Sequence, residues 1–153
     1  MTISAFMCED HGRLDGLFHQ FKTTKNKDLE KAKQFFSSFS RGLQRHIVWE
    51  EEILFPLLEE RTGVLKGGPT AIMRAEHRSL KNLLNMIYDR IAQGRTDSDA
   101  FETGLAKELS THNQTEEAVL YPWIEQCLST EEREARLASM QAVPTERFDG
   151  RCE

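Results

Sequence analysis

The sequence predicts an all-α protein, an up-down-up-down four-helix bundle followed by a short C-terminal helix. Apolar residues recur at steps of three and four over four long stretches, which is the spacing of a buried helix face. No stretch alternates strictly between apolar and polar residues, so we expect essentially no strand. Because long helices joined by short loops pack antiparallel to their neighbours, these stretches predict a bundle.

The first half of the chain predicts two helices. We expect one over residues 4–22 and another over residues 28–61, which Asp28 can cap at its start and Gly63 can close. Pro56 lies inside the second helix, where it removes a backbone hydrogen bond and should bend the last turns. The expected inner faces are His11, Leu14, Phe18 and Phe21 on the first helix, and Phe35, Phe39, Leu43, His46, Glu50, Leu54 and Leu57 on the second.

The second half predicts two more long helices and a short one. After a Lys66-Gly67-Gly68 linker, we expect helices over residues 69–93, 98–128 and 130–143. The expected inner faces of the two long helices are Met73, His77, Leu80, Leu84, Ile87 and Ile91, and then Phe101, Leu105, Leu109, His112, Glu116, Val119 or Leu120, and Trp123. We expect residues 1–143 to form one domain and residues 144–153 to form a tail in which Cys152 is exposed.

The two halves repeat one pattern at an offset of 66 residues (46 to 112 and 50 to 116). His46-x-x-x-Glu50 runs on to Leu54-Phe55-Pro56, and His112-x-x-x-Glu116 runs on to Leu120-Tyr121-Pro122. His11 and His77 are separated by the same offset. Repeated leucines are common in bundles, but a shared histidine, His-x-x-x-Glu motif and proline are not. We therefore expect two helical hairpins of one design, over residues 1–62 and 67–128.

The inner faces of these helices carry four histidines and two glutamates: His11, His46, Glu50, His77, His112 and Glu116. Ionised carboxylates in apolar surroundings are costly without partners, and buried imidazoles need their nitrogens satisfied. A pair of metal ions resolves this conflict. The nitrogen and oxygen donors suit iron or manganese and, less distinctively, zinc. Because the two glutamates come from facing halves, they can bridge the two metals.

This arrangement resembles the hemerythrin-like family, which carries the HHE cation-binding domain. The resemblance covers residues from about 8 to 125 and rests on His11, His77, the two His-x-x-x-Glu motifs and their aromatic-proline endings. It implies a non-haem di-iron centre with an oxo or hydroxo bridge. It also implies that Glu50 and Glu116 bridge the irons and that two histidines bind each iron.

The sequence departs from the oxygen-carrying hemerythrins at two places. Those proteins have His-x-x-x-His on the third helix, whereas Lys81 stands four residues after His77. They end with His-x-x-x-x-Asp, whereas Glu117 is the fifth residue after His112. One histidine ligand is therefore missing, which leaves open positions on both metals. The pattern is more similar to the iron–sulfur-cluster repair proteins of the same superfamily, which have four histidines and two glutamates.

Several neighbouring residues are expected to have plainer roles. Glu51 and Glu117 lie about 100° round the helix from the ligands and should form a polar outer ring. His19 should be a surface or supporting histidine, and Cys8 an ordinary reduced thiol. Tyr121 corresponds to Phe55 in the repeat and should be a core aromatic.

Composition narrows the function classes. The net charge of −5 over 153 residues argues against general nucleic-acid binding. The chain contains no run of 18 apolar residues and no signal-peptide pattern, so we expect neither a membrane span nor secretion. Three cysteines without a C-x-x-C motif indicate a reducing cytoplasm.

The leading functional hypothesis is a di-iron protein that binds a small diatomic ligand or oxidant, such as O2, NO or peroxide. It would serve sensing, scavenging or iron donation under oxidative or nitrosative stress. One alternative is a di-iron oxidoreductase that reduces NO or peroxide with electrons from a redox protein partner, so enzymatic activity is left open. Another is a zinc or manganese bundle for stability, storage or partner docking. A homodimer is also left open.

Overall fold

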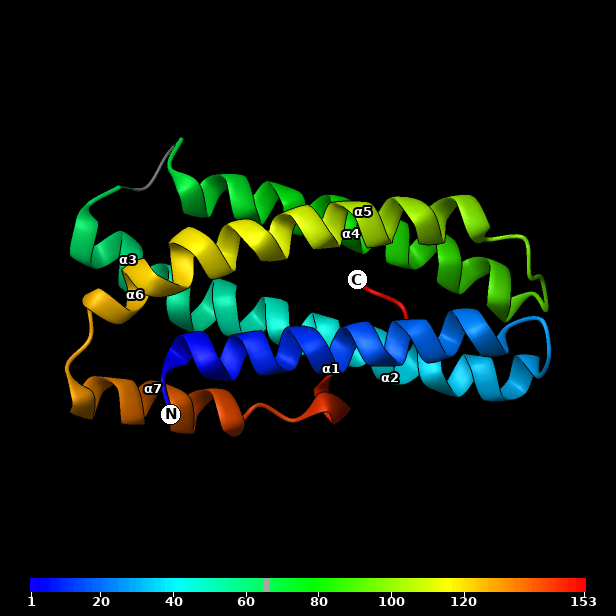
Figure 1. The fold of residues 1–153 in the computed structure, drawn as a ribbon, viewed down its shortest axis with the longest axis horizontal. Coiled ribbons are helices and arrows are strands. Elements are labelled where there is room, and N and C mark those ends of the chain that lie inside the picture. Colours follow the sequence, from blue (N-terminus) through cyan, green and yellow to red (C-terminus); the bar gives the residue numbers. More distant parts are fainter. Residues whose placement is uncertain (65–66) are drawn as a thin grey trace.

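The computed structural model describes residues 1–64 and 67–153, and it contains two helical hairpins side by side (Figure 1). Helices α1 (Ile3–Thr24) and α2 (Leu29–Val48) form the first hairpin, and α4 (Pro69–Ala92) and α5 (Asp99–Thr115) form the second. The four helices alternate in direction, which confirms the predicted up-down-up-down bundle, and the described residues contain no strand. Within the expected linker, Lys66 lies outside the described residues.

Each hairpin continues past its second long helix through a π-helical turn. Helix α2 runs on through η1 (Trp49–Leu54) into α3 (Phe55–Thr62), and α5 runs on through η2 (Glu116–Leu120) into α6 (Tyr121–Gln126). Pro56 and Pro122 have no N–H to donate, and in an α-helix each ring would clash with the carbonyl four residues earlier. The residue before each proline instead donates its N–H to the carbonyl five residues back, on Glu50 or Glu116. The expected disturbance therefore takes the form of a wider turn in which the backbone carbonyl of each glutamate accepts the hydrogen bond.

The C-terminal segment packs against the bundle and does not form an exposed tail. Helix α7 (Thr130–Gln141) begins with a capping box between Ser129 and Glu132, and the buried Met140 accepts a 2.7 Å hydrogen bond from the Trp49 indole through its carbonyl. The expectation that Cys152 is exposed was wrong, because only 2 % of it is accessible. The Asn85 amide holds the backbone N–H and carbonyl of Cys152 at 2.8 and 3.0 Å.

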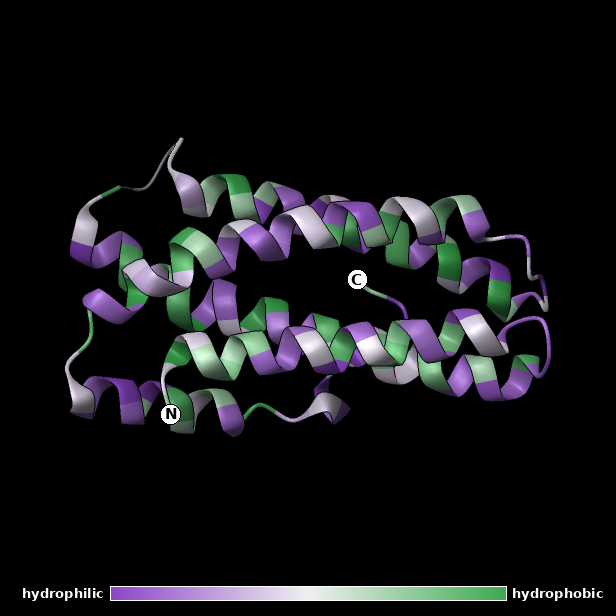
Figure 2. Ribbon diagram, in the orientation of Figure 1, coloured by the Kyte–Doolittle hydropathy of each residue, from purple (hydrophilic) through white to green (hydrophobic). Residues whose placement is uncertain are grey.

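Two hydrophobic clusters of described residues fill the bundle, one toward the hairpin loops and one toward α3 and α6. Figure 2 shows apolar bands that recur along every long helix. The expected inner faces are largely confirmed. Phe35, however, is only partly buried, and Phe36 takes its place against Phe21, with ring centroids 5.0 Å apart. Of the two candidates on the fourth helix, Leu120 is buried and Val119 is exposed. None of the described helices has the length and apolar character needed to cross a membrane.

A buried ion pair joins the two hairpins at their loop end. Lys25 follows α1 and is 2 % exposed, and its Nζ lies 2.6 Å from the Glu102 carboxylate on α5 and also contacts Asp99. Ser98 donates a further hydrogen bond to Glu102. Because a buried charge needs a partner, this contact fixes how the two hairpins meet.

Candidate metal centre

The six predicted site residues converge on one layer of the bundle, between the two hydrophobic clusters. None of them is more than 5 % exposed. Their donor atoms form two overlapping groups that could each hold an ion: His11, His46 and Glu116, and Glu50, His77, His112 and Glu116. The structure therefore brings all six residues together, as the repeat predicts.

The four histidines form two pairs, His11 with His46 and His77 with His112, and each glutamate faces both pairs. The carboxylate-to-Nε2 distances are 3.3 Å from Glu116 Oε1 to His11, 3.0 Å from Glu116 Oε2 to His112, 3.1 Å from Glu50 Oε1 to His77 and 3.9 Å from Glu50 Oε2 to His46. One oxygen of each carboxylate thus lies beside each pair of imidazoles. This placement is what two carboxylates need in order to bridge two neighbouring cations.

Every one of these histidines has a second carboxylate at its other ring nitrogen. The Nδ1 distances are 2.6 Å from His77 to Glu51, 2.7 Å from His112 to Glu76, 2.9 Å from His46 to Asp10 and 3.4 Å from His11 to Glu117. Since an ionised carboxylate only accepts hydrogen bonds, these partners favour the Nδ1–H tautomer. The Nε2 lone pairs are then left for a metal, as in many metal-binding histidines.

These outer carboxylates follow the same repeat, because Asp10 corresponds to Glu76 and Glu51 to Glu117. Each half therefore supports one histidine of its own and one of the other half. Sequence reasoning placed Glu51 and Glu117 in an outer ring without assigning them to histidines, and it missed Asp10 and Glu76. A signal was present, since an acidic residue directly precedes both His11 and His77.

Tyr121 makes the two halves unequal. It is fully buried, as expected of a core aromatic, but its hydroxyl also lies 2.8 Å from Glu50 and 2.9 Å from Glu116. The same oxygen lies 3.2 Å from Nε2 of both His11 and His46. Its counterpart in the repeat, Phe55, stacks on the His77 ring and offers no hydroxyl.

The charges of the cluster are strongly coupled. Burial, together with the negative charge of Glu116, raises the pKa of Glu50 above the usual range of a glutamate. Burial alone would raise the pKa of Glu116 too, but hydrogen bonds from its neighbours, including His11 and His112, lower it. Burial would lower the pKa of His77, yet its hydrogen bonds with carboxylates raise that pKa to about 9. The metal-free cluster therefore holds protons that a bound cation would displace.

The donor atoms fit metal ions for a second reason. Within the described residues, three buried atoms of the cluster make no well-aligned hydrogen bond, namely Glu50 Oε1, Glu116 Oε2 and His77 Nε2, although each lies 3.0–3.1 Å from a neighbouring atom of the cluster. An unsatisfied buried polar atom costs about 1–3 kcal/mol. Metal ions coordinated by these atoms remove that cost, and a set of imidazole and carboxylate donors is suited to iron, manganese or zinc.

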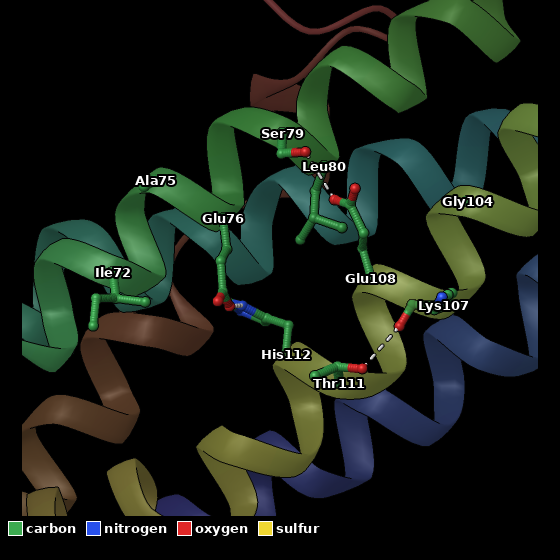
Figure 3. Close-up of a pocket in the computed structure, with 10 residues that line it drawn as sticks. All are labelled: Ile72, Ala75, Glu76, Ser79, Leu80, Gly104, Lys107, Glu108, Thr111 and His112. Carbon is green, nitrogen blue, oxygen red and sulfur yellow. Dashed lines mark hydrogen bonds and ion pairs between the residues drawn. The ribbon is translucent and has the colours of Figure 1, made fainter.

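Among the described residues, one opening in the surface reaches the cluster between α4 and α5 and another reaches it between α1 and α5. The α4/α5 opening has a volume of about 700 Å³, and Figure 3 shows Glu76 reaching across it from α4 to His112 on α5. Its lining also includes Ile72, Ala75 and Leu80, and Ser79 donates a 2.8 Å hydrogen bond to Glu108 across it. The α1/α5 groove has a volume of about 510 Å³ and reaches His11 and Glu117.

Comparison with known proteins points to one family. The chain matches the hemerythrin HHE cation-binding domain over residues 2–124 and again over residues 68–146. It is 43 % identical over 69 residues to the iron–sulfur cluster repair protein YtfE of Edwardsiella ictaluri, covering 45 % of this chain and 30 % of that protein. The protein of the same name from Escherichia coli O157:H7 is 27 % identical over 113 residues, which are 68 % of this chain and 50 % of that protein.

A DNA nickase from Nostoc sp. is 26 % identical over 143 residues, covering 94 % of this chain and 39 % of that protein. The chain thus spans half or less of the length of each of these relatives. No solved structure matches it. Because the family match extends over most of the chain and includes all six converging residues, the protein belongs to the hemerythrin HHE cation-binding family.

Proposed function

We propose that the protein holds a non-haem di-iron centre and binds a small diatomic ligand, NO or O2, at it. The six metal ligands are His11, His46, Glu50, His77, His112 and Glu116. The observation that carries this proposal is the position of the two glutamates, each with one oxygen beside each histidine pair. The hemerythrin family and the relatives named as iron–sulfur cluster repair proteins support iron over manganese or zinc.

The donor count favours an external ligand. Two irons held by these residues would each have two imidazole nitrogens and carboxylate oxygens from the two glutamates, which is fewer protein donors than iron can take and would leave room for a ligand from solution. Lys81 stands where an oxygen carrier has a further histidine, and its ammonium group has no lone pair to offer a metal. Open positions on both irons suit a sensor, scavenger or iron donor better than a reversible oxygen carrier.

The surroundings also suit a small neutral ligand. The α4/α5 opening leads to the Glu76–His112 contact, and apolar side chains such as Ile72 and Leu80 line much of it. A diatomic gas loses little hydration on entering such a passage. The buried aromatic rings of Phe55 and Tyr121 flank the cluster and limit the entry of water to it.

The protein works in the cytoplasm in responses to oxidative or nitrosative stress. The presence of three free cysteines supports this setting. The names of the relatives support a link to damaged iron–sulfur clusters, which nitric oxide and oxidants attack. Electrons for any turnover would come from a redox protein partner.

The test is an anaerobic titration of the iron-loaded protein with NO, followed by optical and electron paramagnetic resonance spectra. We expect saturable binding that the variant Glu50→Ala abolishes. The control is Glu52→Ala, because Glu52 is exposed and pairs with Arg147 on the surface. Iron-loaded wild type that shows no spectral response to NO or O2 would overturn the proposal. Continued consumption of NO or peroxide with an electron donor would instead favour the oxidoreductase.

A further inference from the structure

One face of α1 carries a row of metal-binding residue types. Cys8, His11, Asp15 and His19 follow one another at steps of three and four, so their side chains lie on the same side of the helix. All four line the α1/α5 groove, together with Glu117 from η2. Asp15 and His19 are exposed, whereas His11 is buried at the inner end of the row. The row therefore connects solvent to the first histidine pair.

The other half of the bundle does not repeat this row. The residues that correspond to Cys8, Asp15 and His19 are Arg74, Lys81 and Asn85. Arg74 pairs with Glu59 at 3.2 Å, and Asn85 holds the backbone of Cys152. The repeat keeps the candidate ligand histidine on both α1 and α4, but α4 has no counterpart of Asp15 and His19. The carboxylates that line the α4/α5 opening are already paired, Glu76 with His112 and Glu108 with Ser79.

The inner end of the groove is also the most loosely held part of the cluster. Glu117 lies 3.4 Å from His11 Nδ1, whereas the other three histidines have their carboxylates at 2.6–2.9 Å. Glu50 lies 3.9 Å from His46 but 3.1 Å from His77, so the close group around His11 contains three residues, against four around His77. An ion at the first histidine pair is therefore the easier one to exchange.

The charges along the groove fit a passage for cations. Asp15 and Glu117 are negative, and the positive Lys22 lies at the outer end with its Nζ 4.9 Å from the Phe18 ring centroid. Burial, together with the nearby Glu117 carboxylate, raises the pKa of the Cys8 thiol to about 11. A protonated thiol is a poor metal ligand, so the carboxylates and His19 are the groups that meet an incoming ion.

We propose that metal ions enter and leave the centre through the α1/α5 groove, with Asp15 and His19 as the outer docking pair and Glu117 as the inner relay to His11. This proposal rests on the metal centre proposed above and names the route by which it is filled and emptied. An iron donor needs such a route, because ligands buried in the middle of a bundle cannot release an ion directly to solvent.

Two glycines allow each opening to be narrowed separately. Gly12 lines the α1/α5 groove, and a Cβ built there meets no atom within 4 Å. Gly104 lines the α4/α5 opening, and a Cβ there meets only Leu83, at 3.7 Å. Both lie inside helices, where leucine is a better helix former than glycine. Gly12→Leu and Gly104→Leu are thus a matched pair of variants, each of which narrows one opening and leaves the other unchanged.

The experiment measures the rate at which metal-free protein takes up Co2+, from its visible absorbance, and the rate at which a chelator removes it. We expect Gly12→Leu and the double variant Asp15→Asn/His19→Gln to slow uptake and removal about tenfold, the low end of what a charged cleft contributes to cation association. Gly104→Leu should leave both rates unchanged. The final amount of bound metal should equal that of wild type in all three variants, and circular dichroism should confirm that they fold.

Unchanged rates in Gly12→Leu and in the double variant would overturn the proposed route, as would equal slowing by Gly104→Leu. These outcomes differ from a failure of the metal centre itself. The final absorbance measures how many ions wild type binds, and fewer than two ions per chain at saturation would contradict the dinuclear centre. The rates of uptake and removal test only the route. Uptake of no ion by wild type would overturn both proposals.

Discussion

Tyr121 and Phe55 occupy equivalent positions in the two halves of the bundle, but only Tyr121 brings a hydroxyl to the candidate metal ligands. Its oxygen lies 2.8 Å from Glu50 and 2.9 Å from Glu116, and burial raises its pKa well above the usual value for a tyrosine. The phenol therefore stays protonated and donates its hydrogen to one carboxylate at a time. The two groups of candidate ligands are therefore inequivalent even though their histidines and glutamates are repeated.

Replacing Tyr121 with phenylalanine should destabilise the metal-free protein by about 1–3 kcal/mol, because a buried carboxylate oxygen loses its donor. Urea denaturation in the presence of a chelator measures this free energy of unfolding. The control is Tyr88→Phe, since Tyr88 is only partly buried against the core. Equal losses in the two variants would contradict the role assigned to the Tyr121 hydroxyl.

The outer carboxylates should control metal affinity. Glu51→Gln should weaken binding by about 10–100-fold, because loss of such a partner leaves the tautomer and orientation of a ligand histidine unfixed. Glu117→Gln should have a smaller effect, since its distance to His11 is 3.4 Å against 2.6 Å for Glu51 and His77. Competition with a chelator of known affinity measures the metal affinity of each variant, and Glu52→Gln is the control. A larger effect at Glu117 than at Glu51 would argue against this ranking.

The convergence of the six candidate ligands could be predicted from the sequence because each of them lies in a register that also carries apolar core residues. His77, for example, falls between Met73 and Leu80 on the inner face of α4, and all three are buried. The offset of 66 then pairs it with His11. Periodicity places such residues on a face, and the antiparallel packing of the helices brings the faces together.

The supporting contacts could not be predicted in this way. Asp10 and Glu76 directly precede ligand histidines, so they point about 100° away from the inner face and reach a histidine on a neighbouring helix. Whether they meet it depends on how closely the helices pack. The position of Cys152 depends on hydrogen bonds between side chains and an irregular backbone, which have no periodic signature.

The buried lysine at the loop end should be important for folding. Lys25→Met should cost about 3–5 kcal/mol in unfolding free energy, because it leaves the Glu102 carboxylate buried without its partner. The double variant Lys25→Met/Glu102→Leu should recover part of that loss, since the unpaired carboxylate is gone and the buried Ser98 hydroxyl is the group that still loses its acceptor. Urea denaturation of the three proteins tests this expectation. If the double variant is no more stable than Lys25→Met, the unpaired Glu102 carboxylate is not the cause of the lost stability.

Proton binding by His77 should make the stability of the metal-free protein depend on pH. Its folded pKa of about 9 lies above the value of about 6.5 expected for an unfolded histidine. The stability that it contributes is therefore fully present below about pH 6.5 and is lost as the pH rises through about 9. Denaturation between these pH values, with a chelator present, should show a decline that His77→Gln reduces.

Metal-loaded protein provides the contrast to this decline. A metal ion binds the unprotonated imidazole, so metal affinity should rise over the same pH interval. The loaded protein should consequently become more stable relative to the metal-free protein as the pH increases. If the unfolding free energies of the metal-loaded and metal-free proteins change with pH in parallel, His77 is not a metal ligand.

The most direct test of the dinuclear centre is the iron content and optical spectrum of the protein after iron reconstitution. We predict two irons per chain, with the charge-transfer bands of an oxo-bridged pair, in wild type and in Glu52→Ala, and the loss of those bands in Glu50→Ala and Glu116→Ala. Less than one iron per chain in wild type, without such bands, would contradict the account.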